Sequence, residues 1–364
     1  MDWRAPVLDP PLQTASLPGI GGVLRSQLED FFVEELPAYA PSGTEASGGD
    51  RTTHAFFTLT KRGRSTHDAL SILAEHLGIS PRDVGSAGRK DREAVTVQWV
   101  SVPSSAAAGL ASFRHDDIEL GAPTPHDHKL RMGHLRGNRF RIVVRALDVP
   151  TDEALVHVKT KLDGIEAECG LLNVYGPQRF GRDGQSLDRG VEALRRGRAG
   201  ARGNMTVAAG QAGLFNAWVE LRRREDTLRR VLLGDVLEKV ETGGLFVCSD
   251  PEQDQARLEA GEIEITGPVF GSRMREPAEG SPAEAVEHAT LEWLGVPRSA
   301  LARLGRRAAG TRRSLRIRPT QTQVEALEGE DTPAIAVGFV LPSGSYATRL
   351  CAELQGGSGD PRRR

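Results

Sequence analysis

The clearest alternation of hydrophobic and polar positions in this chain runs from Ala94 to Val102. Val95, Val97 and Trp99 share one face of this segment, and polar side chains stand between them. A period of two residues with β-branched and aromatic side chains is typical of a β-strand. The loop directly before it is rich in glycine, arginine and lysine, and a strand here would hold that loop in a fixed position.

Similar alternation predicts further strands near both ends of the chain, whereas the middle is helical in pattern. The predicted strands are His54–Thr60, Arg139–Leu147, Arg313–Arg318 and Ala334–Leu341. The predicted helices are Thr66–Leu77, a short helix capped by Ser80, Thr151–Leu162 and Gly210–Arg224. Strands on both sides of a helical segment indicate one mixed sheet that is interrupted by an inserted domain.

Composition changes this picture mainly through arginine. The 364 residues carry a net charge of −2, but lysine fills only six of the 47 basic positions. A genome that favours arginine codons would give this bias, and so would a surface that binds phosphate through guanidinium groups. The arginines are also clustered, which fits either an RNA-facing surface or a solvated helix face. The clusters are Arg195–Arg202, Arg222–Arg230 and Arg303–Arg318.

Other residue types exclude several classes of protein. The three cysteines, Cys169, Cys248 and Cys351, have neither disulfide-framework nor zinc-ligand spacing, so a reduced, cytoplasmic protein is expected. The His-Asp-His run at 126–128 has no second ligand pair and is typical of a surface loop. No stretch approaches the ~20 apolar residues of a membrane helix, and the first residues lack the pattern of a signal peptide.

The loop before the first strand contains the candidate chemistry. Asp91 is flanked by Arg89, Lys90 and Arg92, and it follows two glycines that permit close approach of a ligand. These cations could neutralise phosphates around a carboxylate that meets a base. By itself, an aspartate in such a loop is most often a turn or cap residue.

Five segments change that interpretation, because they match one family in the right order. They are VLRSQLEDFFVEEL from Val23, GRKDREAVTVQ from Gly88, RGNRF from Arg136, NVYGPQRFG from Asn173 and LPSGSYAT from Leu341. Together they resemble the signatures of the TruD family of tRNA pseudouridine synthases, including its GxKDxxAxTxQ loop. Any one motif alone would be weak, but the five span nearly the whole chain.

The resemblance implies a fold and an activity. The fold is α+β, with a catalytic domain at 1–157 and 307–364 built on a mixed, mainly antiparallel sheet of pseudouridine synthase type, and an inserted α+β domain at 158–306. The activity is isomerisation of a tRNA uridine, uridine 13 of the D-arm, to pseudouridine. This isomerisation needs no redox change or energy input, so no cofactor and no metal are expected. The expected partner is tRNA, and the expected state is a monomer.

The resemblance also assigns site residues. Asp91 is the implied nucleophile or base, Arg25 the cation that keeps its carboxylate ionised and oriented, and Phe140 an active-site aromatic. Without the resemblance, Arg25 reads as a surface charge and Phe140 as strand core, and for Phe140 both can hold. Substrate contacts are assigned to Phe31, Lys90 and Asn138.

Two further segments carry weaker assignments. Gln178, Arg179 and Phe180 either bind phosphate and substrate or form a structural turn that shapes a wall of the site. Ser345 and Tyr346 lie where a helix begins after a strand, so free backbone N–H groups there could meet uracil carbonyls or a phosphate. Tyr346 replaces the phenylalanine that is frequent at this position in the family.

Two other classes of function fit parts of the sequence. A tRNA-binding or remodelling protein without modification activity would not need an aspartate among phosphate-seeking cations. A glycosylase or methyltransferase would also handle a base. The chain lacks the glycine-rich nucleotide fingerprint, which counts against a user of S-adenosylmethionine.

Overall fold

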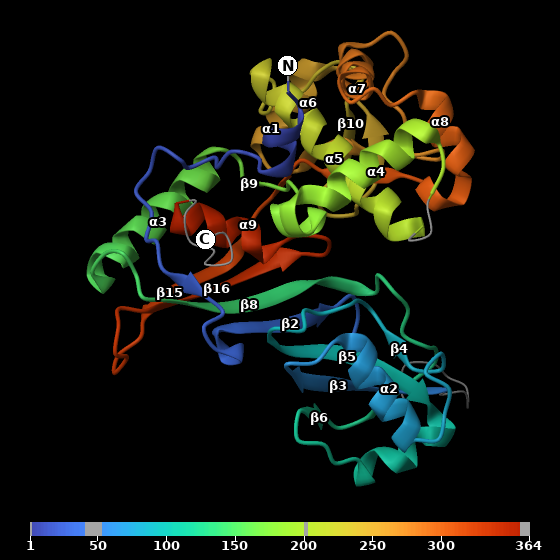
Figure 1. The fold of residues 1–364 in the computed structure, drawn as a ribbon, viewed down its shortest axis with the longest axis vertical. Helices are drawn as coiled ribbons and strands as arrows, with labels where there is room; N and C mark the ends of the chain where they lie inside the picture. Colours follow the sequence, from blue (N-terminus) through green and yellow to red (C-terminus); the bar gives the residue numbers. More distant parts are fainter. Residues whose placement is uncertain (1, 41–52, 200–202, 357–364) are drawn as a thin grey trace. The chain divides into compact units, whose positions relative to one another are not determined.

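The computed structural model describes residues 2–40, 53–199 and 203–356, which form two compact units (Figure 1). Unit 1 comprises Met1–Leu17, Lys161–Arg318 and Thr348–Glu353, and unit 2 comprises Pro18–Thr160, Pro319–Ala347 and Leu354–Arg364. The first 17 residues and a piece of the last helix therefore group with the middle of the chain, unlike in the predicted division at 157/158 and 306/307. That one unit is catalytic and the other an insertion stays a prediction.

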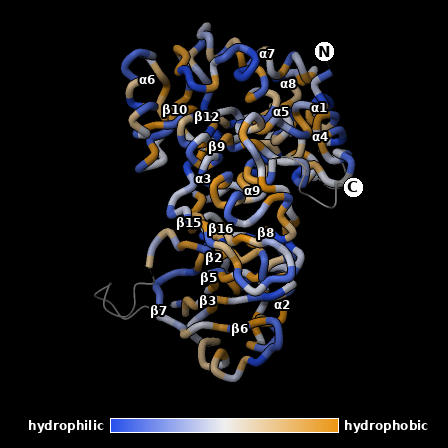
Figure 2. The backbone as a smooth tube through the Cα atoms, turned by 90° about the vertical axis from the view of Figure 1, so that its left-hand side faces the viewer, coloured by the Kyte–Doolittle hydropathy of each residue, from blue (hydrophilic) through white to orange (hydrophobic). Residues whose placement is uncertain are grey.

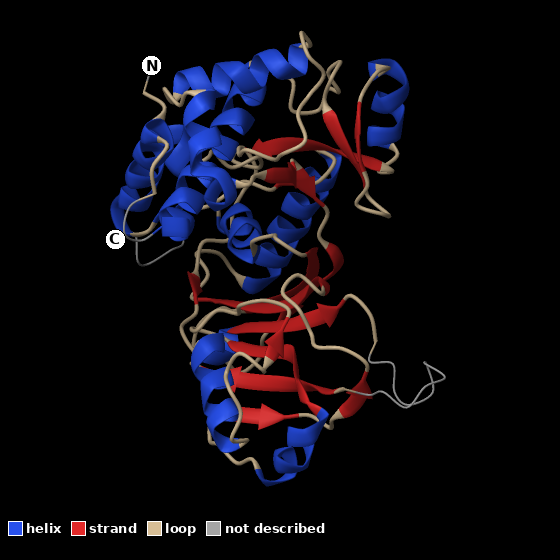
Figure 3. Cartoon of the chain, turned by 90° about the vertical axis from the view of Figure 1, so that its right-hand side faces the viewer, coloured by secondary structure: helices blue, strands red, loops and turns tan. Residues whose placement is uncertain are grey.

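Unit 2 is built on a ten-stranded sheet, drawn in red in Figure 3, and its mixed, mainly antiparallel pairing confirms the predicted fold class. Among the described strand pairs, β2 and β5 alone are parallel. The main path is β15 (Thr320–Ala326), β16 (Ile335–Pro342), β8 (Leu135–Arg145), β2 (Phe31–Pro37), β5 (Val95–Pro103), β3 (His54–Arg62) and β6 (Ile118–Leu120). Three short strands, β1 (Val23–Leu24), β4 (Gly85–Ser86) and β7 (Thr124–His126), pair with β8, β5 and β3.

The parallel pair requires a crossover, because a tight turn can join only antiparallel strands. The chain leaves β2, passes through β3, and returns through helix α2 (Thr66–His76) to β5. Hydrophobic residues recur along the tube at β2, β3 and β5 in Figure 2. The crossover places the loop between β4 and β5 beside the first turn of α2.

Helix α2 begins at Thr66 as predicted, and the Ser65 hydroxyl caps it by accepting a hydrogen bond from the Asp68 N–H at 3.1 Å. Its buried face packs Ala69, Leu73 and Ala74 into the core on one side of the sheet. The short helix predicted after Ser80 is absent from the described structure; residues 81–83 form a turn instead. One turn of hydrogen bonding is too short to offset the cost of nucleating a helix.

The alternation on β5 has an unexpected orientation. Thr96 and Gln98 are fully buried, whereas Val97 and Trp99 are only half-buried. The Thr66 hydroxyl, at the start of α2, donates a 3.0 Å hydrogen bond to the Gln98 amide oxygen, which satisfies one of these buried polar groups. Polar side chains on this face of the strand thus link the helix to the sheet.

Unit 1 combines helices with a four-stranded antiparallel sheet, in the order β11 (Leu245–Val247), β10 (Val236–Lys239), β12 (Ile263–Val269) and β13 (Thr311–Ser314). Two-residue strands β9 (Leu171–Leu172) and β14 (Arg316–Ile317) form a separate pair. The other described helices are α1 (Arg4–Leu8), α3 (Thr151–Ala167), α4 (Gln185–Arg196), α5 (Gly203–Arg224), α6 (Pro251–Glu259), α7 (Pro282–Trp293), α8 (Arg298–Leu304) and α9 (Ala347–Gln355). Helices α3 and α9 each contain residues of both units.

Helix α5 is the centre of unit 1. Phe215 and Trp218 on this helix are buried in one core cluster, and Leu214 and Ala217 in another. Its close contact with α4 depends on two glycines, since a Cβ on Gly210 would lie 2.5 Å from the backbone of Gly190. The long apolar helix therefore organises the unit around itself.

Candidate active site

Asp91 lies in the loop between β4 and β5, in unit 2. Its side chain is 58% exposed, so the carboxylate is open to a ligand. The strand that follows, β5, pairs with β2 and β3 and fixes one end of the loop to the sheet. An exposed carboxylate in a loop that is anchored to a strand has the accessibility that a nucleophile or base requires.

Arg25 is the direct partner of Asp91. Its Nη2 lies 2.9 Å from Asp91 Oδ2, and its side chain is only 13% exposed, so the predicted pair is present in the structure. The same guanidinium lies 3.8 Å from Glu93 and stacks 4.0 Å from the ring centroid of Phe31. Arg25 also has a φ of 59°, a conformation that non-glycine residues seldom adopt. The backbone is strained at the position that aims this cation.

A second cation holds the backbone of the same loop. Lys61 Nζ donates a hydrogen bond of 2.6 Å to the Asp91 carbonyl oxygen, and the Lys61 side chain is fully buried on β3. Burial lowers the pKa of the Lys61 ammonium to about 8, although the Asp91 charge acts in the opposite direction and the Lys90 charge adds to the lowering. Lys61 is therefore a buried cation that ligates the main chain of Asp91.

A third cation, Lys90, is held inside the unit rather than exposed to a substrate. Its Nζ lies 2.6 Å from Glu35 Oε2, as a close ion pair, and donates to Asn138 Oδ1 at 2.6 Å. Its backbone N–H donates to the Thr66 hydroxyl at 2.8 Å. The predicted contact of Lys90 with phosphate does not agree with this environment, because the ammonium is buried and already paired. Lys90 instead fixes the residue before Asp91.

Three aromatic rings continue from Arg25 into the sheet. Phe31 meets Phe140 edge-on with ring centroids 6.4 Å apart, and Phe140 stacks on Phe339 at 5.3 Å. All three rings are buried. Phe140 is thus part of the strand core, as one of its two interpretations predicts, and Phe31 presents its face to the Arg25 guanidinium.

The C-terminal candidates lie on the turn between β16 and α9. Leu341 of β16 pairs with Asn138 of β8, so this turn leaves the sheet at the end where Asn138 lies. The Ser345 hydroxyl is buried and has no hydrogen-bond partner among the described residues. Tyr346 is exposed. Both residues belong to the same unit as Asp91.

The NVYGPQRFG segment belongs to unit 1. Phe180 is fully buried in the core there, which fits a structural turn better than the substrate contact assigned to it. Gln178 and Arg179 are exposed, and the Arg179 guanidinium lies 5.8 Å from the Tyr175 ring. Asn173 donates to the Ser314 carbonyl and accepts from Arg313. The structure thus favours a structural turn for most of this motif.

The arginine clusters do not form a continuous surface. Arg222 and Arg312 are buried and paired with Asp235 and Glu287. Several others on α4 and α5 pair with carboxylates of their own helix: Arg195 and Arg196 with Glu192, Arg223 and Arg224 with Glu220. Within the described parts of these three clusters, the exposed arginines without an ion-pair partner are Arg198, Arg230, Arg303, Arg306 and Arg307. Arg202 lies outside the described residues.

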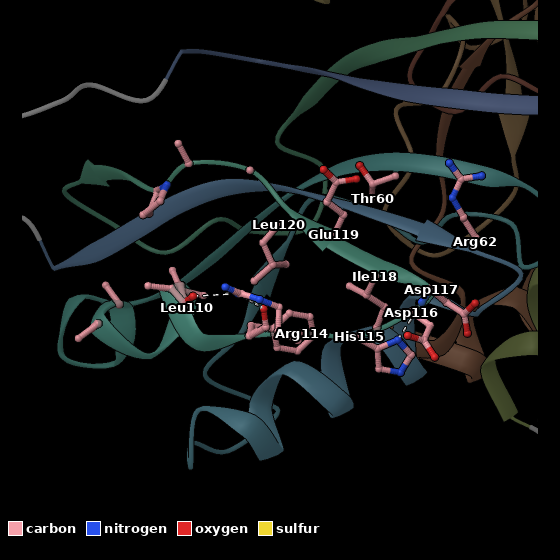
Figure 4. A pocket seen from close by; sticks show the side chains of 17 residues that line it. Thr60, Arg62, Leu110, Arg114, His115, Asp116, Asp117, Ile118, Glu119 and Leu120 are labelled. Atoms are coloured by element: carbon pink, nitrogen blue, oxygen red, sulfur yellow. Dashed lines mark hydrogen bonds between the residues drawn. The ribbon is translucent and has the colours of Figure 1, made fainter.

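Unit 2 contains a cavity of about 640 Å³, which Asp91 does not line, between the 3₁₀ segment Ser104–Ser112 and β6 (Figure 4). Arg62 and Asp117 both line it, but Arg62 pairs with Glu29 and Asp117 pairs with Arg64. Two of its charged groups are thus already compensated. Within the described ranges, no three His, Cys, Asp or Glu side chains are grouped as metal ligands. No described helix is both long and apolar enough to cross a bilayer.

Sequence reasoning missed Lys61, Glu35 and Phe339. The signal for the first two was present, because a strand has a period of two. Lys61 is in phase with the buried Phe57 and Leu59, and Glu35 is in phase with Phe31 and Val33. A charge in phase with apolar residues indicates a buried, paired group. Phe339 requires the register of β16 on β8, which pairs it with Phe140.

Comparison with known proteins gives a consistent result. The profile of the family tRNA pseudouridine synthase D (TruD) matches residues 9–197 and 200–354. A tRNA pseudouridine synthase D of Anaeromyxobacter sp. is 40% identical over 95% of this chain and 96% of its own length. A tRNA pseudouridine synthase D of Thermus thermophilus is 37% identical over 94% of this chain and 91% of its own length. The crystal structure of a candidate member from Methanosarcina mazei has a TM-score of 0.75, with 22% identity over 98% of each chain.

The buried ammonium of Lys61 generates a prediction about stability and pH. Its pKa is about 8 in the folded protein and close to the ordinary 10.5 in the unfolded chain, so the unfolded chain binds more protons between these values. The charged Lys61 ammonium therefore destabilises the folded protein fully below pH 8. This destabilisation is relieved as the pH rises to 10.5. In urea unfolding from pH 7 to 10.5, the wild type should gain about 3 kcal/mol relative to Lys61→Met.

Lys239→Met, at an exposed position of unit 1, is the control, and its curve should run parallel to that of the wild type. Parallel curves for Lys61→Met as well would show that the Lys61 ammonium is not desolvated.

Proposed function

Because this chain belongs to the TruD family of tRNA pseudouridine synthases, whose members are isomerases, we propose that it converts a uridine of tRNA to pseudouridine at Asp91. The observation that carries this proposal is the exposed Asp91 carboxylate, whose side chain is oriented by Arg25 and whose main chain is held by Lys61. An orientation set before the substrate arrives lowers the cost of reaching the transition state.

The reaction is balanced without a co-reactant. The bond from C1′ to N1 of the uridine breaks, the uracil rotates, and C1′ joins C5; the proton released from C5 is matched by the one gained at N1. Asp91 acts as nucleophile or base near C1′ and C6. Arg25 keeps that carboxylate ionised and aimed. The target is uridine 13 of the D-arm, by resemblance to the family.

The uracil needs partners once it is extracted from the RNA stack. Asn138 is suited to this role, because its amide oxygen accepts from Lys90 and its nitrogen has no hydrogen-bond partner among the described residues, so it can donate to a uracil carbonyl. Phe31 and Phe140 are buried, and Phe31 supports the Arg25 guanidinium from the sheet. Ser345 and Tyr346 lie at the same end of the sheet as Asn138 and contribute polar groups.

The first prediction concerns Asp91. Asp91→Asn keeps the size of the side chain but removes the charge, so pseudouridine formation should fall by at least ~10³-fold. Affinity for tRNA should change by less than ~1.5 kcal/mol, because one exposed carboxylate contributes little to RNA binding. Single-turnover release of tritium from [5-³H]uridine in tRNA measures the rate, and filter binding measures the affinity.

Glu93→Gln is the matched control, since Glu93 is the other carboxylate near Arg25. It should stay within a few-fold of the wild-type rate. Retained turnover in Asp91→Asn, or its loss in Glu93→Gln alone, would transfer the chemistry to another group.

The second prediction concerns Arg25. Arg25→Gln removes the cation that aims Asp91, so single turnover should slow by about 10- to 100-fold while tRNA affinity stays nearly constant. Arg25→Lys should recover part of the rate, because a lysine keeps the charge but lacks the planar fork.

Arg62→Gln removes an exposed arginine of the same unit that pairs with Glu29, and it should have little effect. A wild-type rate in Arg25→Gln would assign Arg25 to packing against Phe31 alone.

The third prediction concerns the exposed, unpaired arginines. Reversing Arg306 and Arg307 to glutamate should weaken tRNA binding. The slope of log affinity against log salt concentration should become less steep by about 1 to 2, because fewer counterions are released. Turnover at saturating tRNA should remain close to wild type, since these residues position RNA without touching the uracil.

The control reverses Arg189 and Arg196, which are bonded within α4 to Gln185 and Glu192. Equal losses in both pairs would indicate a general charge effect. If reversing Arg306 and Arg307 did not weaken tRNA binding, these two arginines would belong to a solvated face that does not contact RNA. A tRNA-binding protein without catalysis would show the binding losses but no tritium release in any variant.

A further inference from the structure

Unit 1 contains a cavity that the proposed reaction does not use. It has a volume of about 900 Å³ and is lined by residues of unit 1 alone. Apolar side chains such as Leu232 and Leu258 form part of its wall, and the exposed arginines Arg229 and Arg230 line it as well. A cavity of this size is in the range that holds a small organic ligand.

Arg316 is the unusual residue of this cavity. It is only 3% exposed, and it lies on β14, where it pairs in register with Leu172 of β9. Its Nε and Nη1 atoms are buried without a hydrogen-bond partner among the described residues. A buried guanidinium stays charged in proteins, so unsatisfied N–H groups of this kind are costly and need an explanation.

The acidic side chain with the largest effect on Arg316 compensates its charge only in part. Glu264 is the largest favourable charge for Arg316, but no described carboxylate comes within 4 Å of its guanidinium. Burial raises the pKa of the Glu264 carboxyl to about 7, although Arg316 acts against this shift. Glu264 is thus a weak counter-charge for Arg316, because it lies outside ion-pair distance of the guanidinium and burial disfavours its charged form.

Side chains of buried or neighbouring residues hold the backbone of the segment that carries Arg229 and Arg230. The buried Arg222, paired with Asp235, donates to the carbonyl oxygens of Thr227 and Arg230. Gln255 donates to the Arg229 carbonyl and accepts from the Val231 N–H. Arg229 itself has only a long contact of 3.6 Å with Glu168. The cavity is thus pre-formed, with its cations in place.

We propose that this cavity binds the phosphate group of a nucleotide, with buried Arg316 and exposed Arg229 and Arg230 as its ligands. Guanidinium groups match the geometry of phosphate oxygens, and the apolar wall suits a base. The carboxylates that also line the cavity, Asp226, Glu252 and Glu259, are suited to sugar hydroxyls or to exocyclic amines. The nucleotide is either free or part of an RNA chain.

The experiment uses the full chain and two probes, inorganic phosphate and adenosine 5′-monophosphate, in isothermal titration calorimetry without other anions. The wild type should bind the nucleotide saturably, and Arg316→Met and Arg230→Gln should each weaken that binding by at least about tenfold. Arg189→Gln, an exposed arginine outside the cavity, should bind as the wild type does. None of these readouts requires pseudouridine formation.

A second measurement separates a folding defect from a binding defect. Arg316→Met removes an unpaired buried charge, so its thermal unfolding temperature in phosphate-free buffer should equal or exceed that of the wild type. If it fails to fold, the surface variants Arg229→Gln and Arg230→Gln decide the question, because their side chains are exposed.

Salt-dependent tRNA binding by the same variants then identifies the source of the phosphate. Weaker tRNA binding and a flatter salt slope in Arg316→Met and Arg230→Gln would assign the cavity to an RNA nucleotide. Unchanged tRNA binding with lost binding of the monophosphate would assign it to a free nucleotide. The proposal is overturned if neither probe nor tRNA affinity responds to these substitutions, or if the probe binds all variants alike.

Discussion

Two lysine ammonium groups held out of water determine the geometry around Asp91. Removing an ammonium from water costs on the order of several kcal/mol, so each must find close polar partners when the protein folds. Lys61 finds the Asp91 carbonyl, and Lys90 finds Glu35 and Asn138. If the loop shifted, two buried charges would lose their ligands together. Moving the loop would leave these buried ammonium groups without partners, at a large cost in free energy. The loop is therefore rigid, even though the Asp91 carboxylate itself is exposed.

The sequence carries most of the information about the sheet and part of the information about the site. The strand periods around Val95 and Phe140 and the helical pattern from Thr66 lead directly to β5, β8 and α2. The Arg25–Asp91 pair follows from the family motifs. The burial of Lys61 and Glu35 could be predicted from their positions in the two-residue period of their strands. That period does not predict which residues they pair with. Phe339 depends on a strand register that local patterns do not determine.

The arginines show why composition is a poor guide to surface. Arg222, Arg312 and Arg316 look like members of basic runs, yet all three are buried. The ion-pair partners of Arg222 and Arg312 are distant in sequence or on other elements, as with Arg312 of β13 and Glu287 of α7. The buried Nε and Nη1 atoms of Arg316 have no hydrogen-bond partner among the described residues. Only the folded chain separates arginines that stabilise the interior from those free to meet phosphate. The Lys90 ammonium, predicted to contact the substrate, is likewise paired inside the unit, with Glu35 and Asn138.

The crossover between β2 and β5 has a consequence for the order in which the chain can fold during synthesis. Arg25, Phe31, Glu35, Lys61 and Thr66 all precede Asp91, so most contacts of the loop exist once β5 has left the ribosome. Asn138 joins later, with β8. Unit 1 differs, because Thr14, near its start, is bonded to Glu353, near its end. Closure of that unit has to wait for the last helix, while the neighbourhood of Asp91 can assemble early.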